Sequence, residues 1–137
     1  METKVFINFA VADLQRSVEF FTKVGYTFNE HFTDETATCM VISDHIYAML
    51  LTTERFKDFT DKAVTDAKKS IEVMNSFSCD SKQAVDEIFA RGISAGGRES
   101  APTQDHGFMY GREFEDPDGH IWSYFWMDPA AIPANQS

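Results

Sequence analysis

The chain has 137 residues, of which 43% are hydrophobic, enough for one globular domain with its own core. Its formal net charge of −10 argues against nucleic-acid binding, which needs clustered Lys and Arg, and is compatible with a cationic ligand. The sequence has no apolar run of the roughly 20 residues that cross a bilayer and no signal-peptide pattern, and its two cysteines suggest free thiols. We therefore expect a cytoplasmic protein.

The first half of the chain is predicted to contain a strand, a helix and three more strands. Val5–Val11 alternates and is rich in Val, Ile and Phe, which is typical of a strand. Asp13 is the expected N-cap of the helix, because its carboxylate can accept from the free N–H groups of the next turn, and Gly25 is the expected stop. Three strands are then expected, at 26–33, 37–43 and 46–52.

A polar segment at 54–70, with one or two short helical turns, is predicted to link this half to a second one. In the second half, a strand over 72–79 precedes a helix with its N-cap at Asp80 and its stop at Gly92. Three more strands are expected, at 93–99, 106–115 and 120–127.

The two halves repeat one another. The same spacing separates Asp13 from Gly25 and Asp80 from Gly92. This match predicts two βαβββ modules, at about 4–53 and 71–127, within one domain spanning 1–137, because neither module could bury its sheet face alone. We expect an α+β fold in which the modules form a curved eight-stranded mixed sheet, with helices on the convex side and a cavity on the other.

Two motifs carry a resemblance to a known superfamily. The segment 11–21, VADLQRSVEFF, followed by Gly25-Tyr26, is similar to the V-x-D-L-x-x-S-x-x-F-Y start of the vicinal oxygen chelate superfamily of glyoxalases, bleomycin resistance proteins and dioxygenases. EDPDGH at 115–120 matches its D-P-D-G-[NH] turn, whose two Asp residues we expect to be purely structural. The segment 105–112 resembles an uncharacterised glyoxalase-like subgroup. The resemblance implies the glyoxalase/bleomycin-resistance fold and a homodimer.

The resemblance also implies a divalent metal held by His and Glu from four strands. In this chain the four positions fall on residues that are poor ligands for borderline metals: Phe6, Ala48, Val73 (or Met74 if the register differs by one) and Ser123. The four His residues have no compact spacing that would aim two imidazoles at one point. We therefore expect no metal and no other cofactor, and keep a divalent metal as an alternative.

If the sheet forms a cup, alternate residues of its strands line the cavity. On the first strand these are Phe6, Asn8 and Ala10, and on the last strand they include Ser123 and Phe125. Asn8 either meets a ligand or bonds a neighbouring strand, because an amide buried without partners is costly.

The strand beside the last one supplies further candidates. Arg112 and Glu113 are consecutive, so only one of them can face the cavity. An inward-facing Arg would bind an anionic substrate, whereas an inward-facing Glu would act as a base or bind a cation. Alternatively, Arg112 pairs with a surface carboxylate. No catalytic residue is assigned, and the candidate ligand-binding residues are Asn8, Ser123, His106, Tyr110, Arg112, Glu113, Phe6 and Phe125.

These features favour a protein that binds a small organic molecule in the sheet cavity without a metal, as drug-sequestering members of the superfamily do. The alternative is a metal-dependent lyase or isomerase of glyoxalase type, similar to lactoylglutathione lyase, with a non-standard site. Further alternatives are a dioxygenase-like enzyme and a non-catalytic interaction module. The expected partners are a small-molecule ligand and a second copy of the chain, with neither nucleic acid nor membrane.

Overall fold

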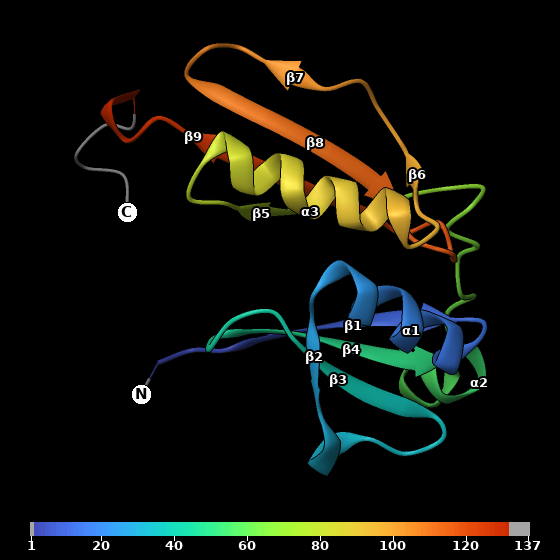
Figure 1. Cartoon of the computed structure of the whole chain (residues 1–137). Helices are drawn as coiled ribbons and strands as arrows, with labels where there is room; N and C mark the ends of the chain where they lie inside the picture. The colour runs from blue at the N-terminus through green and yellow to red at the C-terminus, as the bar shows by residue number, and fades with distance from the viewer. Residues whose placement is uncertain (1, 132–137) are drawn as a thin grey trace.

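The computed structural model describes residues 2–131, and its strands form two mixed sheets (Figure 1). The first sheet has the order β1-β4-β3-β2, in which β1 and β4 are parallel and the other neighbours are antiparallel. A 3₁₀ helix, η1 (Glu30–Phe32), replaces the end of the strand expected at 26–33. The main elements are β1 (Val5–Val11), α1 (Leu14–Val24), β2 (Thr27–Asn29), β3 (Ala37–Val41) and β4 (Ile46–Thr52).

The second sheet repeats this arrangement. Its order is β5-β9-β8-β6, with β5 parallel to β9, and a short strand, β7, also pairs with β8. The segment between the sheets contains α2 (Thr53–Phe56) and the 3₁₀ helix η2 (Lys57–Phe59). The other elements are β5 (Asn75–Ser78), α3 (Lys82–Ser94), β6 (Arg98–Glu99), β7 (Gln104–Asp105), β8 (Met109–Glu115), β9 (Ile121–Met127) and the 3₁₀ helix η3 (Pro129–Ala131).

The ends of α1 are confirmed as the sequence predicted them. The Asp13 side chain accepts a hydrogen bond from the backbone N–H of Arg16 at 3.1 Å. Gly25 ends the helix with a φ of 119°, a left-handed conformation that favours glycine.

The ends of α3 differ from the prediction. The N-cap is Ser81, one residue later than expected, and its hydroxyl accepts from the N–H of Ala84 at 3.0 Å. The helix also runs through Gly92 to Ser94 instead of stopping at Gly92. Gly92 has a packing role: a Cβ added there would lie 2.4 Å from the Phe114 ring of β8. The absence of a side chain thus allows α3 to approach its sheet closely.

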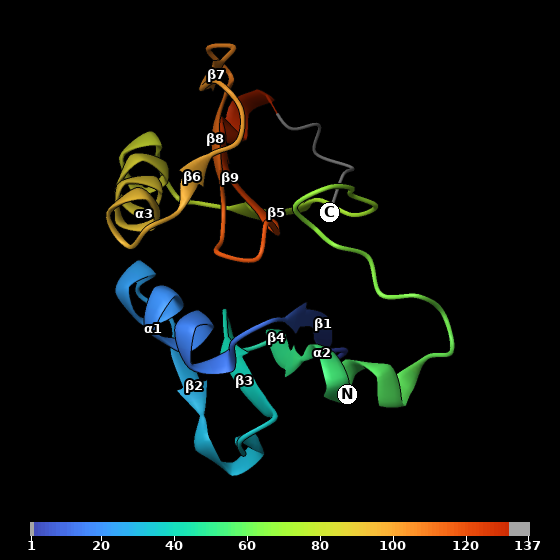
Figure 2. The ribbon, with the colours of Figure 1, turned by 90° about the vertical axis from the view of Figure 1, so that its right-hand side faces the viewer.

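One core joins the two halves. Helices α1 and α3 contact each other and lie between the two sheets (Figure 2). The ring of Trp122 on β9 lies 5.1 Å from Phe9 of β1 and 4.8 Å from Phe21 of α1, measured between centroids. The hydroxyls of Tyr26 and Tyr124 are 2.8 Å apart in the same core. Aromatic side chains from the helix-facing side of each sheet therefore pack together.

This shared core decides how the sheets are placed. Because the helix-facing sides of both sheets pack against each other, the opposite sides, which we call the outer faces, point away from the core (Figure 2). The mixed α+β class is confirmed, but the single curved eight-stranded sheet is not. Within residues 2–131 the strands form separate sheets of four and five strands.

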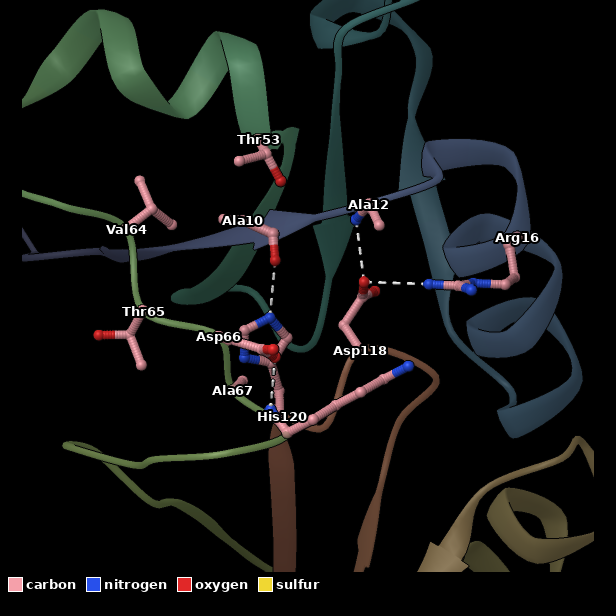
Figure 3. Close-up of a pocket in the computed structure, with 11 residues that line it drawn as sticks. Ala10, Ala12, Arg16, Thr53, Val64, Thr65, Asp66, Ala67, Asp118 and His120 are labelled. Atoms are coloured by element: carbon pink, nitrogen blue, oxygen red, sulfur yellow. Dashed lines mark hydrogen bonds and ion pairs between the residues drawn. The ribbon is translucent and has the colours of Figure 1, made fainter.

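The DPDG turn fastens the two halves together (Figure 3). Asp118 accepts hydrogen bonds from the Ala12 N–H at 2.9 Å, the Arg16 guanidinium at 3.0 Å and the Ser17 hydroxyl at 3.3 Å. From the same turn, His120 Nε2 lies 2.8 Å from the carbonyl oxygen of Ala10. The turn therefore has a structural role between the modules as well as within its own hairpin.

Asp116, in the same turn, is buried. Its carboxylate accepts from Trp122 Nε1–H at 3.0 Å and from the backbone N–H groups of Asp118 and His120 at 2.9 and 3.0 Å. Burial raises the pKa of Asp116 above its ordinary value, although His120 and the Trp122 hydrogen bond oppose that rise.

Among residues 2–131, no helix is both long enough and apolar enough to cross a bilayer.

Candidate functional site

The outer face of the first sheet is mostly apolar, with Asn8 as a polar exception. Phe6 of β1 stacks on its cross-strand partner Tyr47, with ring centroids 4.8 Å apart, and 49% of Phe6 is exposed. Asn8 lies beside Met49 in the next pair, and its amide donates to the carbonyl of Phe6 at 3.3 Å. A shallow cavity of about 260 Å³ covers part of this face, and its lining includes Asn8, Met49, Leu51, His31, Arg55 and Phe59.

The outer face of the second sheet carries a row of polar side chains. Ser76 of β5 pairs with Ser123 of β9, and Ser123 pairs with Glu113 of β8. Ser100, just after β6, donates its hydroxyl to Glu113 Oε1 at 2.9 Å, and its backbone N–H donates to the Glu113 carbonyl. Three hydroxyls and one carboxylate thus cross the sheet in one line, which we call the Glu113 row.

A cavity of about 340 Å³ opens above the Glu113 row. Phe125 and Gly111 form the next pair along the sheet, and Met109 pairs with Met127 beyond them. A Cβ added at Gly111 would meet its nearest atoms at 3.5–3.7 Å, an ordinary contact distance. The cavity therefore has a polar strip on one side and an apolar side chain and a thioether pair on the other. Its lining also includes Ala101, Pro102 and Gln104.

Arg112 and Tyr110 direct their side chains to the helix side of the second sheet. The Tyr110 hydroxyl donates to Asp86 Oδ1 of α3 at 2.6 Å, and Arg112 Nη1 donates to the same oxygen at 3.1 Å. The Arg112 guanidinium carbon lies 3.8 Å from the centroid of the Phe89 ring. The hydrogen bond from Tyr110, supported by Arg112, lowers the pKa of Asp86. Of the two consecutive charged residues, Glu113 is thus the one that faces the outer cavity.

The eight candidate residues consequently separate into groups. Glu113, Ser123 and Phe125 come together at the cavity of the second sheet, whereas Phe6 and Asn8 lie on the outer face of the first. Tyr110 and Arg112 bond Asp86 instead, although part of Arg112 lines the wall of the cavity. His106 is exposed in the hairpin between β7 and β8.

Several residues of this site were not anticipated from the sequence. Ser76 could have been found, because alternation along β5 and the parallel pairing with β9 place it opposite Ser123. Ser100 and Gln104 fall between the strands expected at 93–99 and 106–115, so only the structure shows that this segment lies beside β8. No pattern in the sequence indicated Gly111, because its role is to leave space beside Phe125.

The superfamily's metal positions do not fit a metal here. The structure corrects one of them: Ala48 points into the core, and the outward-facing residue on β4 beside Asn8 is Met49. Val73 precedes β5. Phe6, Met49 and Ser123 offer a ring, a soft thioether and a neutral hydroxyl. Across residues 2–131, the structure has no group of three His, Cys, Asp or Glu side chains placed to hold a metal ion.

Two further cavities lie where the halves meet. One, of about 400 Å³, surrounds the contacts of Asp118 and His120 (Figure 3). The other, of about 440 Å³, lies beneath the connecting segment, and its lining includes Ile7, Phe9 and Ile121. Neither contains Glu113 or Ser123.

Comparisons with known proteins fit this geometry. Residues 3–43 match the family model described as bleomycin resistance protein-like N-terminal. The chain has the fold of the vicinal oxygen chelate superfamily. The predicted resemblance is confirmed over residues 3–43 by this family model, and solved structures named as members of the glyoxalase, bleomycin resistance and dioxygenase group share the fold over nearly the whole chain.

Three of these structures show the extent of the likeness. A glyoxalase-related enzyme from Fulvimarina pelagi has a TM-score of 0.77 at 18% identity, covering 92% of this chain and 88% of that one. A glyoxalase/bleomycin resistance protein/dioxygenase from Nocardioides has a TM-score of 0.74 at 21% identity, covering 100% and 91%. A hypothetical protein from S. aureus has a TM-score of 0.77 at 22% identity, covering 92% and 94%. No curated protein matches the chain significantly.

Proposed function

We propose that this protein binds a small organic molecule, without a metal, in the outer cavity of its second sheet. The observation that carries the proposal is the composition of that cavity: Glu113 and Ser123 sit beside Phe125 and Met109, and no metal-binding set accompanies them within residues 2–131. A few polar groups placed in an apolar hollow are typical of small-molecule sites. The proposal favours binding over a metal-dependent lyase, isomerase or dioxygenase reaction.

We also propose that the protein is a homodimer in which the first sheet of one copy covers the second sheet of the other. Support comes from the outward placement of both faces and from large apolar side chains left exposed on and beside the first sheet: Phe6, Phe32 and Phe59. A partner sheet above the Glu113 row would turn an open cavity into a closed cup. An isologous pair of this kind creates two equivalent cups.

A Phe6→Asp substitution tests the dimer. A carboxylate in the centre of an apolar interface is costly, so the variant is expected to run as a monomer in light scattering at concentrations where the parent is a dimer. Thr3→Asp, at an exposed residue two positions before β1, is the control for added charge and should leave the dimer intact. A monomeric parent, or a dimeric Phe6→Asp, would exclude this arrangement.

A Gly111→Leu substitution tests the binding site. The space above Gly111 can accept a side chain, so leucine should fill the cavity while the sheet still forms. In a thermal-shift screen of small organic molecules, compounds that raise the Tm of the parent should also raise that of Gly111→Ala and should not stabilise Gly111→Leu. If Gly111→Leu responds to every compound as the parent does, the binding site lies elsewhere.

A further inference from the structure

We infer that the cavity selects organic cations, with a primary ammonium or similar N–H-rich group of the ligand held at the Glu113 row. This inference rests on the proposed function, because it names the class of molecule that the same cavity takes. It uses three features of the structure: the donors and acceptors of the row, the engagement of nearby basic side chains, and the apolar wall.

The hydrogen-bonding groups of the Glu113 row suit a cation. An ionised carboxylate only accepts hydrogen bonds, and a serine hydroxyl can accept while donating elsewhere. Ser100 already donates to one oxygen of Glu113, so that hydroxyl keeps lone pairs for a ligand N–H. Ser123 and Ser76 continue the row next to the carboxylate. An ammonium group with three donors finds a carboxylate and neighbouring hydroxyls on one strip of the cavity.

The protein's own basic groups near the row are used elsewhere. Arg112 bonds Asp86 on the helix side through Nη1, while its buried Nε has no hydrogen-bond partner within the described residues, and Arg98 makes a 2.6 Å ion pair with Glu115. Among the ion pairs of residues 2–131, none involves Glu113. A ligand cation would therefore meet a carboxylate that has a hydroxyl partner but no counter-charge. The formal net charge of −10 further favours cations over anions.

The rest of the cavity implies an organic ligand instead of a bare metal ion. Phe125 and the Met109–Met127 pair provide an aromatic ring and two thioethers a short way along the sheet from Glu113. Calcium and magnesium ions need several carboxylate or carbonyl oxygens, and a single carboxylate with hydroxyls does not supply them. The arrangement fits a molecule with a cationic group at one end and an apolar body of one ring or a short chain at the other.

The experiment compares matched compounds that differ in charge: 2-phenylethylamine, 2-phenylethanol and 3-phenylpropanoate, with butylamine and hexylamine and their alcohols as a second series. Binding to the parent is measured by calorimetry and thermal shift, together with Glu113→Gln and Glu87→Gln. Glu87 is exposed on α3, so it controls for the loss of one negative charge. Ser123→Ala serves as a second variant of the row that keeps the charge.

The amines are expected to bind the parent and Glu87→Gln with similar affinity, and Glu113→Gln about tenfold or more weakly. Ser123→Ala should weaken amine binding a few-fold, and the acid should not bind. If alcohols bind as tightly as amines, and Glu113→Gln changes neither, the preference for cations is wrong. If Gly111→Leu still weakened the binding of these compounds, the cavity would remain the binding site and only its preference for cations would be excluded. If no compound binds the parent, both the class and the site are contradicted.

Discussion

Glu113 and Ser123 are cross-strand partners on β8 and β9, and their side chains share the outer face of the second sheet. Ser123 occupies the position where the superfamily resemblance implies a metal-binding Glu, so the carboxylate of this chain lies one strand away from that position. The proposed metal-free site rests on this difference: a serine hydroxyl stands at the position of the expected metal ligand, and the carboxylate of Glu113 lies beside it.

Restoring ligands at two of the superfamily's positions tests the assignment of these positions. We expect the parent to take up no stoichiometric Ni²⁺ or Zn²⁺, whereas Phe6→His combined with Ser123→Glu should gain metal affinity. In one chain these residues lie on outer faces that point away from each other, so the gain should require the dimer. Calorimetry on the double variant measures the gain in metal affinity. Adding Phe59→Asp, which places a charge among the exposed apolar side chains beside the first sheet, tests whether that gain depends on the dimer. A double variant that binds no better than the parent would show that the two positions do not meet.

A Gly92→Ala substitution should destabilise the protein although alanine favours helices. The new Cβ would lie 2.4–2.8 Å from three atoms of the Phe114 ring, which is closer than carbon atoms pack, so α3 or the ring must move. Overpacking of this kind costs roughly 1–3 kcal/mol and opposes a helix-propensity gain of about 1 kcal/mol. Urea unfolding should show a net loss of up to about 2 kcal/mol. Gly111→Ala, where added atoms meet only ordinary contacts, is the control, and an equal effect of both changes would contradict the packing argument.

An Asp118→Ala substitution should loosen the junction between the two halves. It removes the acceptor of the Ala12 N–H and the Arg16 guanidinium, and one of the two acceptors of the buried Ser17 hydroxyl, which also bonds the Asp13 carbonyl. The expected loss of unfolding free energy is about 1–3 kcal/mol. Arg16→Ala removes only a partly exposed ion pair and should cost about 0–1 kcal/mol. Hydrogen exchange at the start of α1 should increase in Asp118→Ala. Unchanged exchange there would show that other contacts hold the junction.

The Tyr26–Tyr124 pair should make the protein sensitive to alkali. Burial raises the pKa of Tyr26 from 10.0 to about 12, and the pKa of Tyr124 rises for the same reason. A raised folded-state pKa means that the stabilising contribution is complete below pH 10 and is lost as the pH rises toward 12. For Tyr26 alone this pKa difference corresponds to about 3 kcal/mol. Tyr26→Phe should be somewhat less stable at pH 7, because it loses the hydrogen bond to Tyr124. It should also lose less stability between pH 10 and 12, because the titrating hydroxyl is gone; urea unfolding measures both effects. A parallel decline in both proteins would contradict this assignment.

Much of the first module could be predicted from local patterns. Asp13 and Gly25 carry signals that act within one turn of the chain, and both ends of α1 are confirmed. Alternation along β1 also correctly placed Phe6 and Asn8 on the face of the sheet opposite to the one that Phe9 turns toward the helices. These features depend on neighbours in sequence, so the sequence alone determines them.

The errors arise where a distant part of the chain decides the outcome. Gly92 resembles a helix stop, yet Phe114 on another strand explains why a glycine is needed there. The choice between Ala48 and Met49 depended on a register match, and an error of one residue moves a side chain to the opposite face. The placement of the sheets depends on contacts of Trp122 with Phe9 and Phe21, which no local pattern reveals.

Native mass spectrometry of the purified protein, before and after addition of Ni²⁺, Zn²⁺, Mn²⁺ or Fe²⁺, tests the central claim most directly. The proposed function predicts a dimer that takes up no stoichiometric metal and carries a small organic adduct, which Gly111→Leu does not retain. One metal ion per chain, retained on dilution, would contradict the metal-free site and make a glyoxalase-type enzyme the better account.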